Sequence, residues 1–172
     1  VRLKNPDAFI VYRPHPDVLS GNRKGHLTES MALEHADYIE VESGILGCIA
    51  LADEVHTLSS LAGFDALIRQ KPVTTYGQPF YAGWGLTEDF APVNRRLRQL
   101  SVDELTAACL LYYPRYWDWT LNGYTHCEAA LNQLIKQRDA IAGTANGAIP
   151  RITYWHRQVR KLATLGKAWT AH

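Results

Sequence analysis

The segment from Glu54 to Tyr76 constrains the fold more than any other part of the sequence. Residues 54–58 alternate in polarity and include β-branched side chains, which is typical of a strand. Residues 60–70 place apolar side chains on one face of a helix, and residues 72–76 return to a strand pattern. Such a strand–helix–strand unit crosses over right-handed and pairs its strands in parallel. The segment therefore predicts an α/β fold with a parallel sheet.

The sequence before this segment continues the same alternation of strands and helices. Residues 8–13 and 38–41 are short apolar runs that predict strands, and residues 28–36 predict a short helix. Residues 44–52 are small and apolar, so we expect a buried helix that packs on the sheet. This alternation predicts a Rossmann-like open parallel sheet.

After residue 92 the pattern changes to helices. Ser101 and Glu104 form a capping box that begins one helix, and a similar pattern at residues 125–128 begins another that runs to about residue 141. Between them, residues 112–124 are aromatic and look irregular. We expect three parts: a Rossmann-like core at 1–92, a helical extension at 93–142, and a linker with a basic amphipathic C-terminal helix at 143–172.

Polar residues and glycines follow three of the predicted strands. His15 stands between two prolines after the first strand, Ser59 and Ser60 follow the strand at 54–58, and Gly77 follows the strand at 72–76. Open α/β sheets bind ligands at the carboxyl ends of their strands. Unpaired N–H groups at the start of the helix after Ser60 suit a phosphate. The pattern predicts a nucleotide site, although a serine pair can also be only a helix cap and His15 only a turn residue.

The loop at 77–89 is rich in aromatic residues and glycine. Aromatic faces stack on sugar rings and bases, and glycines let the backbone approach a ligand closely. The aromatic side chains can instead close the end of the sheet as core. In a mixed arrangement, Phe80 and Trp84 pack inward while Tyr81 points outward. Asp65, about one and a half turns into the helix, can face either the ligand crevice or solvent.

Two blocks resemble a known family: Thr57–Asp65 (TLSSLAGFD) and Tyr76–Thr87 (YGQPFYAGWGLT). They look like the corresponding blocks of the capsule polysaccharide β-Kdo transferases. These bacterial glycosyltransferases use CMP-Kdo to build the Kdo linker between a lipid and a capsular polysaccharide. The resemblance covers residues 8–112 well and the rest weakly. Asp65 departs from the family pattern, which has glutamate there, so the carboxylate keeps its charge and loses reach.

The resemblance implies that the chain is the donor-binding C-terminal lobe of an inverting, metal-independent glycosyltransferase of the two-lobed GT-B type. It assigns His15 a catalytic role, because a His-Pro motif in CMP-sugar-using sialyltransferases contacts the nucleotide phosphate and helps the leaving group. The catalytic base is expected in the other lobe. The expected donor contacts are Arg13, Ser59, Ser60, Gly63, Asp65, Tyr76, Gly77 and Tyr81.

The implied partners are the CMP-Kdo donor, a lipid-linked Kdo acceptor and an N-terminal lobe. No cofactor, metal or nucleic acid is expected. The histidines are dispersed without paired metal-ligand spacing. We expect the protein at the cytoplasmic face of the inner membrane. Two other functions stay open, a non-catalytic capsule assembly or export module and a sugar-nucleotide epimerase-like domain.

The C-terminal part has an uneven charge. Residues 140–172 contain five basic and no acidic residues, in a chain with a net charge of +1. Residues 151–169 carry an apolar stripe beside these basic residues, which fits either a helix on a membrane surface or a helix that returns to a second lobe. Because the chain opens at Val1 without Met and close to a strand, we expect it to be part of a longer protein.

Overall fold

The structure is a computed structural model, and it describes residues 1–19 and 27–142. The chain divides into two compact units, Val1–Tyr112 and Tyr113–His172. We describe each unit by itself. The predicted linker and the amphipathic helix at 151–169 lie outside the described residues, and the predicted division at residues 92 and 142 stays a prediction.

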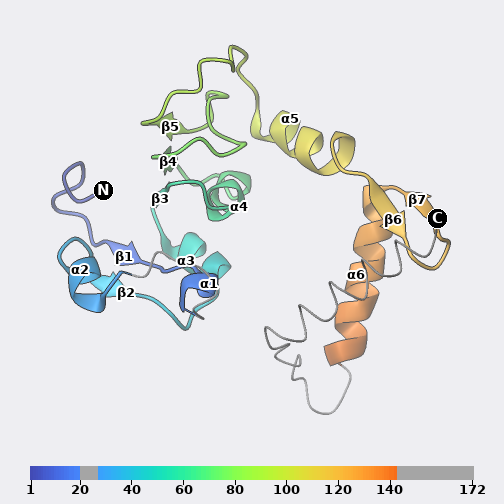
Figure 1. The fold of residues 1–172 in the computed structure, drawn as a ribbon, viewed down its shortest axis with the longest axis horizontal. Coiled ribbons are helices and arrows are strands. Elements are labelled where there is room, and N and C mark those ends of the chain that lie inside the picture. Colours follow the sequence, from blue (N-terminus) through green and yellow to red (C-terminus); the bar gives the residue numbers. More distant parts are fainter. Residues whose placement is uncertain (20–26, 143–172) are drawn as a thin grey trace, which may run out of the picture. The chain divides into compact units, whose positions relative to one another are not determined.

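The first unit contains the predicted strand–helix–strand segment. Strand β3 spans Val55–Thr57, helix α4 spans Ala62–Ile68 and strand β4 spans Val73–Thr75. The two strands pair in parallel, with Val55 opposite Val73. A third parallel strand, β5 at Glu88–Asp89, pairs with β4 at the end of the segment that we expected to be only a loop. Figure 1 shows the three strands side by side with α4 next to them.

The core of this unit lies between the sheet and α4. Its buried members are Ile49, Phe64, Ala66, Leu67, Val73, Tyr81 and Leu105. Helix α3 (Ile45–Leu51) contributes one buried side chain to this core, that of Ile49, whereas Leu51 is 89% exposed. The expectation that this whole segment is buried is therefore wrong. Its residues are small and apolar on every side, so the pattern could not indicate which single face would be covered.

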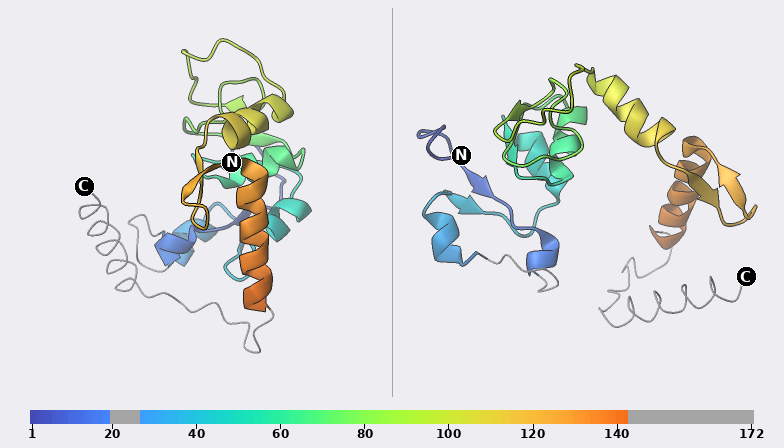
Figure 2. Two further views of the ribbon diagram at one scale, coloured as in Figure 1. Left: turned by 90° about the vertical axis from the view of Figure 1, so that its right-hand side faces the viewer. Right: turned by 45° about the horizontal axis from the view of Figure 1, so that its top comes forward.

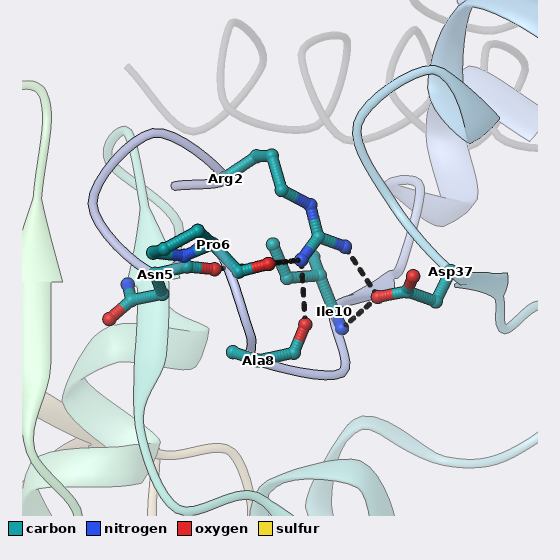
Figure 3. Close-up of polar contacts among 6 residues, drawn as sticks. All are labelled: Arg2, Asn5, Pro6, Ala8, Ile10 and Asp37. Atoms are coloured by element: carbon teal, nitrogen blue, oxygen red, sulfur yellow. Dashed lines mark hydrogen bonds and ion pairs between the residues drawn. The ribbon is translucent and has the colours of Figure 1, made fainter.

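Strands β1 (Val11–Tyr12) and β2 (Tyr38–Ile39) form a separate parallel pair. Short helices α1 (Pro16–Leu19) and α2 (Glu29–Leu33) lie between them in the chain. The Asp37 carboxylate ties this pair to the N-terminal segment, because it accepts from the Ile10 N–H at 2.7 Å and from the Arg2 guanidinium at 2.5 Å. Arg2 also donates to the carbonyls of Pro6 and Ala8, as Figure 3 shows. These hydrogen bonds, with the Ile10 N–H foremost, lower the pKa of Asp37.

The capping box at Ser101 and Glu104 is confirmed. The Ser101 hydroxyl accepts from the Glu104 N–H at 3.1 Å, and the Glu104 carboxylate accepts from the Ser101 N–H at 2.8 Å. Helix α5 follows at Val102–Ala107 and passes into a π-helical turn at Ala108–Tyr112. The α/β class with parallel strands and helices toward the C-terminus is thus as the sequence predicts.

The second unit contains an antiparallel hairpin and a long helix. Strands β6 (Tyr116–Asp118) and β7 (Gly123–Thr125) form the hairpin, and α6 spans Cys127–Ala142. The hairpin contacts α6, and it lies beside that orange helix in both views of Figure 2. The expectation of irregular structure at 112–124 is therefore wrong. The hairpin forms because the Asp118 side chain accepts from the Thr120 and Leu121 N–H groups and shapes a tight turn between the strands.

Candidate functional site

The turn between β3 and α4, at Thr57–Leu61, carries the predicted serine pair. We call it the β3–α4 turn. Its backbone is held by its own side chains: the Thr57 hydroxyl accepts from the Ser60 N–H at 3.1 Å, and the Ser60 hydroxyl accepts from the Ala62 N–H at 3.2 Å. Ser59, Ser60 and Leu61 are all exposed. The turn thus presents two serines at the end of a strand in a defined backbone conformation.

The expected helix start differs from the observed one. Leu61, rather than a serine, is the N-cap residue of α4, and it makes no side-chain cap hydrogen bond. The Ser60 hydroxyl still satisfies one N–H group at the start of α4, because it accepts from the Ala62 N–H. Helix α4 has only seven residues, so its N-terminus alone does not make a phosphate site. Any phosphate contact here would come from the N–H and hydroxyl groups of the β3–α4 turn.

The end of β4 lies directly against this turn. The Tyr76 N–H donates to the Thr57 carbonyl at 2.9 Å, and the Gly77 N–H donates to the Leu58 carbonyl at 3.0 Å. A Cβ on Gly77 would stand 2.6 Å from that same carbonyl oxygen, so only glycine fits. The structure therefore places Tyr76 and Gly77 against Thr57 and Leu58 of the turn that carries the serines, as parallel pairing of β3 and β4 predicts.

Tyr81 is placed differently from our expectation. Its side chain is fully buried, so the expectation that Tyr81 points outward is wrong. Phe80 is 42% exposed, but its ring packs against Phe64 with centroids 5.0 Å apart, as the mixed arrangement expects. The Tyr81 hydroxyl donates to the Ser60 carbonyl at 2.5 Å. Its ring lies over Gly63, where a Cβ would come within 2.6 Å of the tyrosine Cζ. Gly63 and Tyr81 thus form one contact behind the β3–α4 turn, and their assignment as donor contacts stays a prediction.

Asp65 is half-buried in the first turn of α4. Its carbonyl accepts from the Arg69 guanidinium at 2.8 Å, while its carboxylate oxygen stands 3.9 Å from the same guanidinium. This long ion pair leaves the carboxylate loosely held. A donor contact by Asp65 stays a prediction.

His15 lies after β1, in the other sheet of the first unit. Its Nδ1 accepts a hydrogen bond from the Asp17 N–H at 3.1 Å, and its side chain is 47% exposed. In the neutral ring this places the proton on Nε2, which is then a donor. Arg13, two residues earlier, is half-buried. The convergence of His15 and Arg13 with the β3–α4 turn stays a prediction.

The face of the sheet opposite α4 carries a polar cluster that sequence reasoning missed. The Thr74 hydroxyl donates to the Glu54 carboxylate at 2.5 Å, and His56 contacts both that carboxylate (Nε2, 3.4 Å) and the Tyr76 hydroxyl (Nδ1, 3.1 Å). Glu88 joins the cluster because its carboxylate accepts from the Thr74 hydroxyl at 3.4 Å, and it also pairs with Lys4. Burial lowers the pKa of His56, against the opposing effect of Glu54. The signal was present in the strands, whose alternate residues are polar.

In residues 1–19 and 27–142, no group of three His, Cys, Asp or Glu side chains is placed to hold a metal ion. Among the same residues, no helix is both long and apolar enough to cross a membrane.

Known proteins resemble this chain in sequence. The model of the family "Capsule polysaccharide biosynthesis protein" matches residues 1–116. The capsule polysaccharide modification protein LipA of Neisseria meningitidis is 48% identical over 139 residues, which cover 81% of this chain and 20% of LipA. The lipopolysaccharide-processing protein LpsZ of Rhizobium meliloti is 41% identical over 138 residues, or 80% of this chain and 31% of LpsZ.

Solved structures resemble it as well. KpsC of Thermosulfurimonas dismutans, described as a β-Kdo 2,7 transferase, superposes with a TM-score of 0.70 at 46% identity over 79% of this chain and 43% of that one. Its β-Kdo 2,4 transferase counterpart gives a TM-score of 0.65 at 33% identity, over 78% and 42% of the two chains. The chain thus spans less than half of either structure and a fifth of LipA.

The parallel α/β fold and these superpositions define the class: a Rossmann-like lobe of the kind found in GT-B glycosyltransferases. The chain belongs to the capsule polysaccharide biosynthesis protein family, whose model matches most of its length. This confirms the family that the blocks at Thr57–Asp65 and Tyr76–Thr87 indicate.

Proposed function

We propose that this chain forms the donor-binding part of a β-Kdo transferase in capsular polysaccharide biosynthesis. The observation that carries the proposal is the 46% identity with a KpsC β-Kdo 2,7 transferase across 79% of this chain. The β3–α4 turn supports it, because it lies at the carboxyl end of parallel strands, where α/β folds bind nucleotides. The donor is CMP-Kdo, and the acceptor is a lipid-linked, Kdo-bearing glycan at the cytoplasmic face of the inner membrane.

In the proposed reaction, the bond from the anomeric carbon of Kdo to the phosphate oxygen breaks and CMP leaves as an anion, while the anomeric carbon gains a new bond to an acceptor hydroxyl oxygen. Ser59 and Ser60 would donate hydrogen bonds to this phosphate, and the Nε2–H of His15 would donate to it as negative charge develops. Donors aimed at developing charge make one of the largest contributions to catalysis. The base that removes the acceptor's proton would come from another lobe, so this chain alone would bind the donor without turnover.

A titration of the purified protein with CMP, followed by ¹⁵N–¹H NMR, tests the proposal. We expect CMP at millimolar concentration to shift the amide signals of the β3–α4 turn, and UDP to shift them less. His15→Ala should weaken CMP binding about tenfold or more, because a hydrogen bond to a charged group contributes about 1.5–3 kcal/mol. The matched control is His126→Ala in the second unit, an exposed histidine that should leave the affinity unchanged.

Three results would contradict the proposal or its parts. Absence of any CMP-dependent shift would favour the non-catalytic assembly module. A stronger response to UDP-sugars than to CMP would favour the epimerase-like domain. Equal affinities of wild type and His15→Ala would remove His15 from the phosphate site while leaving the donor site in place.

A further inference from the structure

Tyr81 is a buried phenol whose hydroxyl contacts the β3–α4 turn at two points, the Ser60 carbonyl and the Thr57 side chain. Its side chain has no exposed surface, and its ring packs against Phe64 and Phe80, with centroids 6.5 and 5.2 Å away. Burial raises the pKa of the hydroxyl to about 12, so it remains a donor across the physiological range. A buried tyrosine hydroxyl needs a partner, and the Ser60 carbonyl supplies one at 2.5 Å.

The orientation of that carbonyl fixes the neighbouring N–H group. A trans peptide unit is planar, and its C=O and N–H point in opposite directions. The Ser60 carbonyl points inward, because it accepts both from Tyr81 and from the Gly63 N–H at 3.2 Å. The N–H of Leu61, on the other side of the same peptide plane, therefore points away from the core. Ser60 and Leu61 are both exposed, which fits an N–H group on the solvent side of the turn.

Tyr81 is itself held from both sides. On one side, the Arg96 guanidinium donates to the carbonyls of Pro79 and Ala82 and lies 5.1 Å from the Trp84 ring. On the other, the Asp89 carboxylate accepts from the Gly83 N–H at 2.7 Å. Asp89 belongs to β5, so the loop is anchored to the sheet just beyond Tyr81. The tyrosine hydroxyl thus has a fixed place from which it can constrain the turn.

We propose that Tyr81 is a positioning residue for phosphate binding, which turns the Leu61 N–H outward by holding the Ser60 carbonyl inward. This inference rests on the proposed function, and it replaces the expectation that Tyr81 touches the donor directly. It also explains why Gly63 is paired with Tyr81. A side chain at position 63 would displace the ring and with it the hydroxyl.

The test is Tyr81→Phe, which removes one oxygen and keeps the ring in the core. Affinities for CMP and for cytidine, which lacks the phosphate, are measured by NMR titration on wild type and variant. We expect Tyr81→Phe to weaken CMP binding about two- to tenfold, the value of one hydrogen bond, and to leave cytidine binding unchanged. The CMP-induced shift of the Leu61 amide signal should shrink as well. Tyr124→Phe, an exposed tyrosine in the hairpin, is the matched control and should change neither affinity.

A purely structural role for Tyr81 would lower both affinities together or neither, and either result would overturn the inference while the proposed function stands. A wild-type protein that binds CMP no better than cytidine would overturn the proposed phosphate site and this inference with it. A thermal unfolding curve for each variant shows whether the protein is folded at the temperature at which its affinity for CMP is measured. If Tyr81→Phe unfolds at the temperature of measurement, the same titration near 5 °C and the Leu61 amide shift decide the question.

Discussion

The two faces of the β3–β4–β5 sheet differ sharply. On one face, Val55 and Val73 meet α4 in an apolar core that also holds Tyr81. On the other, His56, Thr74 and Glu88 lie side by side in register and form a polar network. Successive residues of a strand point to opposite faces, so one three-residue strand contributes to both. The α4 face therefore contributes stability and holds the β3–α4 turn in place, while the opposite face carries His56, whose pKa burial lowers.

The largest expected effect tests whether the α4 face is the stabilising one. Leu67 is 4% exposed in α4, and Leu67→Ala should lower the free energy of unfolding by about 2–5 kcal/mol, because it removes buried methyl groups and leaves a cavity. Urea unfolding followed by circular dichroism measures the change.

The same substitution at an exposed position is the control. Leu51 is 89% exposed in α3, and Leu51→Ala should change the free energy of unfolding by no more than about 0.5 kcal/mol. Equal losses at Leu67 and Leu51 would show that the core does not lie against α4, and the contrast between the two sheet faces would fail.

The next largest change in stability is expected at Gly63, where α4 contacts Tyr81 behind the β3–α4 turn. Gly63→Ala should cost about 1–3 kcal/mol, because its Cβ would meet the buried ring of Tyr81. Gly47→Ala in α3 should have the opposite sign and stabilise by up to about 1 kcal/mol, because nothing lies within 4 Å of its Cβ and alanine favours a helix. Unfolding by urea measures both. A Gly63→Ala protein as stable as Gly47→Ala would mean that Tyr81 is not fixed over Gly63.

The elements that sequence predicts well are those with a clear period. The strand–helix–strand unit from Val55 to Thr75 lies where the alternation and the helical face place it. Strand β5 has no such signal, since Glu88 and Asp89 are poor strand formers and gain their place only by pairing with β4. The hairpin at 116–125 was missed for a related reason: its turn depends on Asp118 bonding its own backbone.

The candidate site also has one part that the sequence predicts and one that it does not. Parallel pairing predicts that Gly77 lies against the β3–α4 turn, and it does, because its N–H donates to the Leu58 carbonyl. The full burial of Tyr81 could not be predicted, because adjacent aromatic residues in a loop carry no period to mark the inner one. Gly63 shows the physical reason: the ring that is buried is the one that a residue without a side chain, eighteen positions earlier, leaves room for.

The smallest expected effect lies on the polar face, where protonation of His56 should set a pH dependence. Burial lowers the pKa of His56 below its ordinary value of 6.5, although Glu54 partly opposes this. As the pH falls below about 6.5, the unfolded chain therefore binds a proton before the folded protein does. The stability is fully present above pH 6.5 and declines as the pH falls toward the folded pKa. One proton limits the slope to about 1.4 kcal/mol per pH unit.

Urea unfolding of wild type and His56→Gln at pH values from 5 to 8 measures this slope. The difference in free energy of unfolding between the two proteins should be constant above pH 7 and should move in favour of the variant as the pH falls below 6.5. His126→Gln, which replaces a histidine whose side chain is 74% exposed, should keep the wild-type slope. Parallel curves for wild type and His56→Gln would show that the imidazole is as easily protonated in the folded protein as in the unfolded chain, and the polar face would then be a solvated surface rather than a partly buried network.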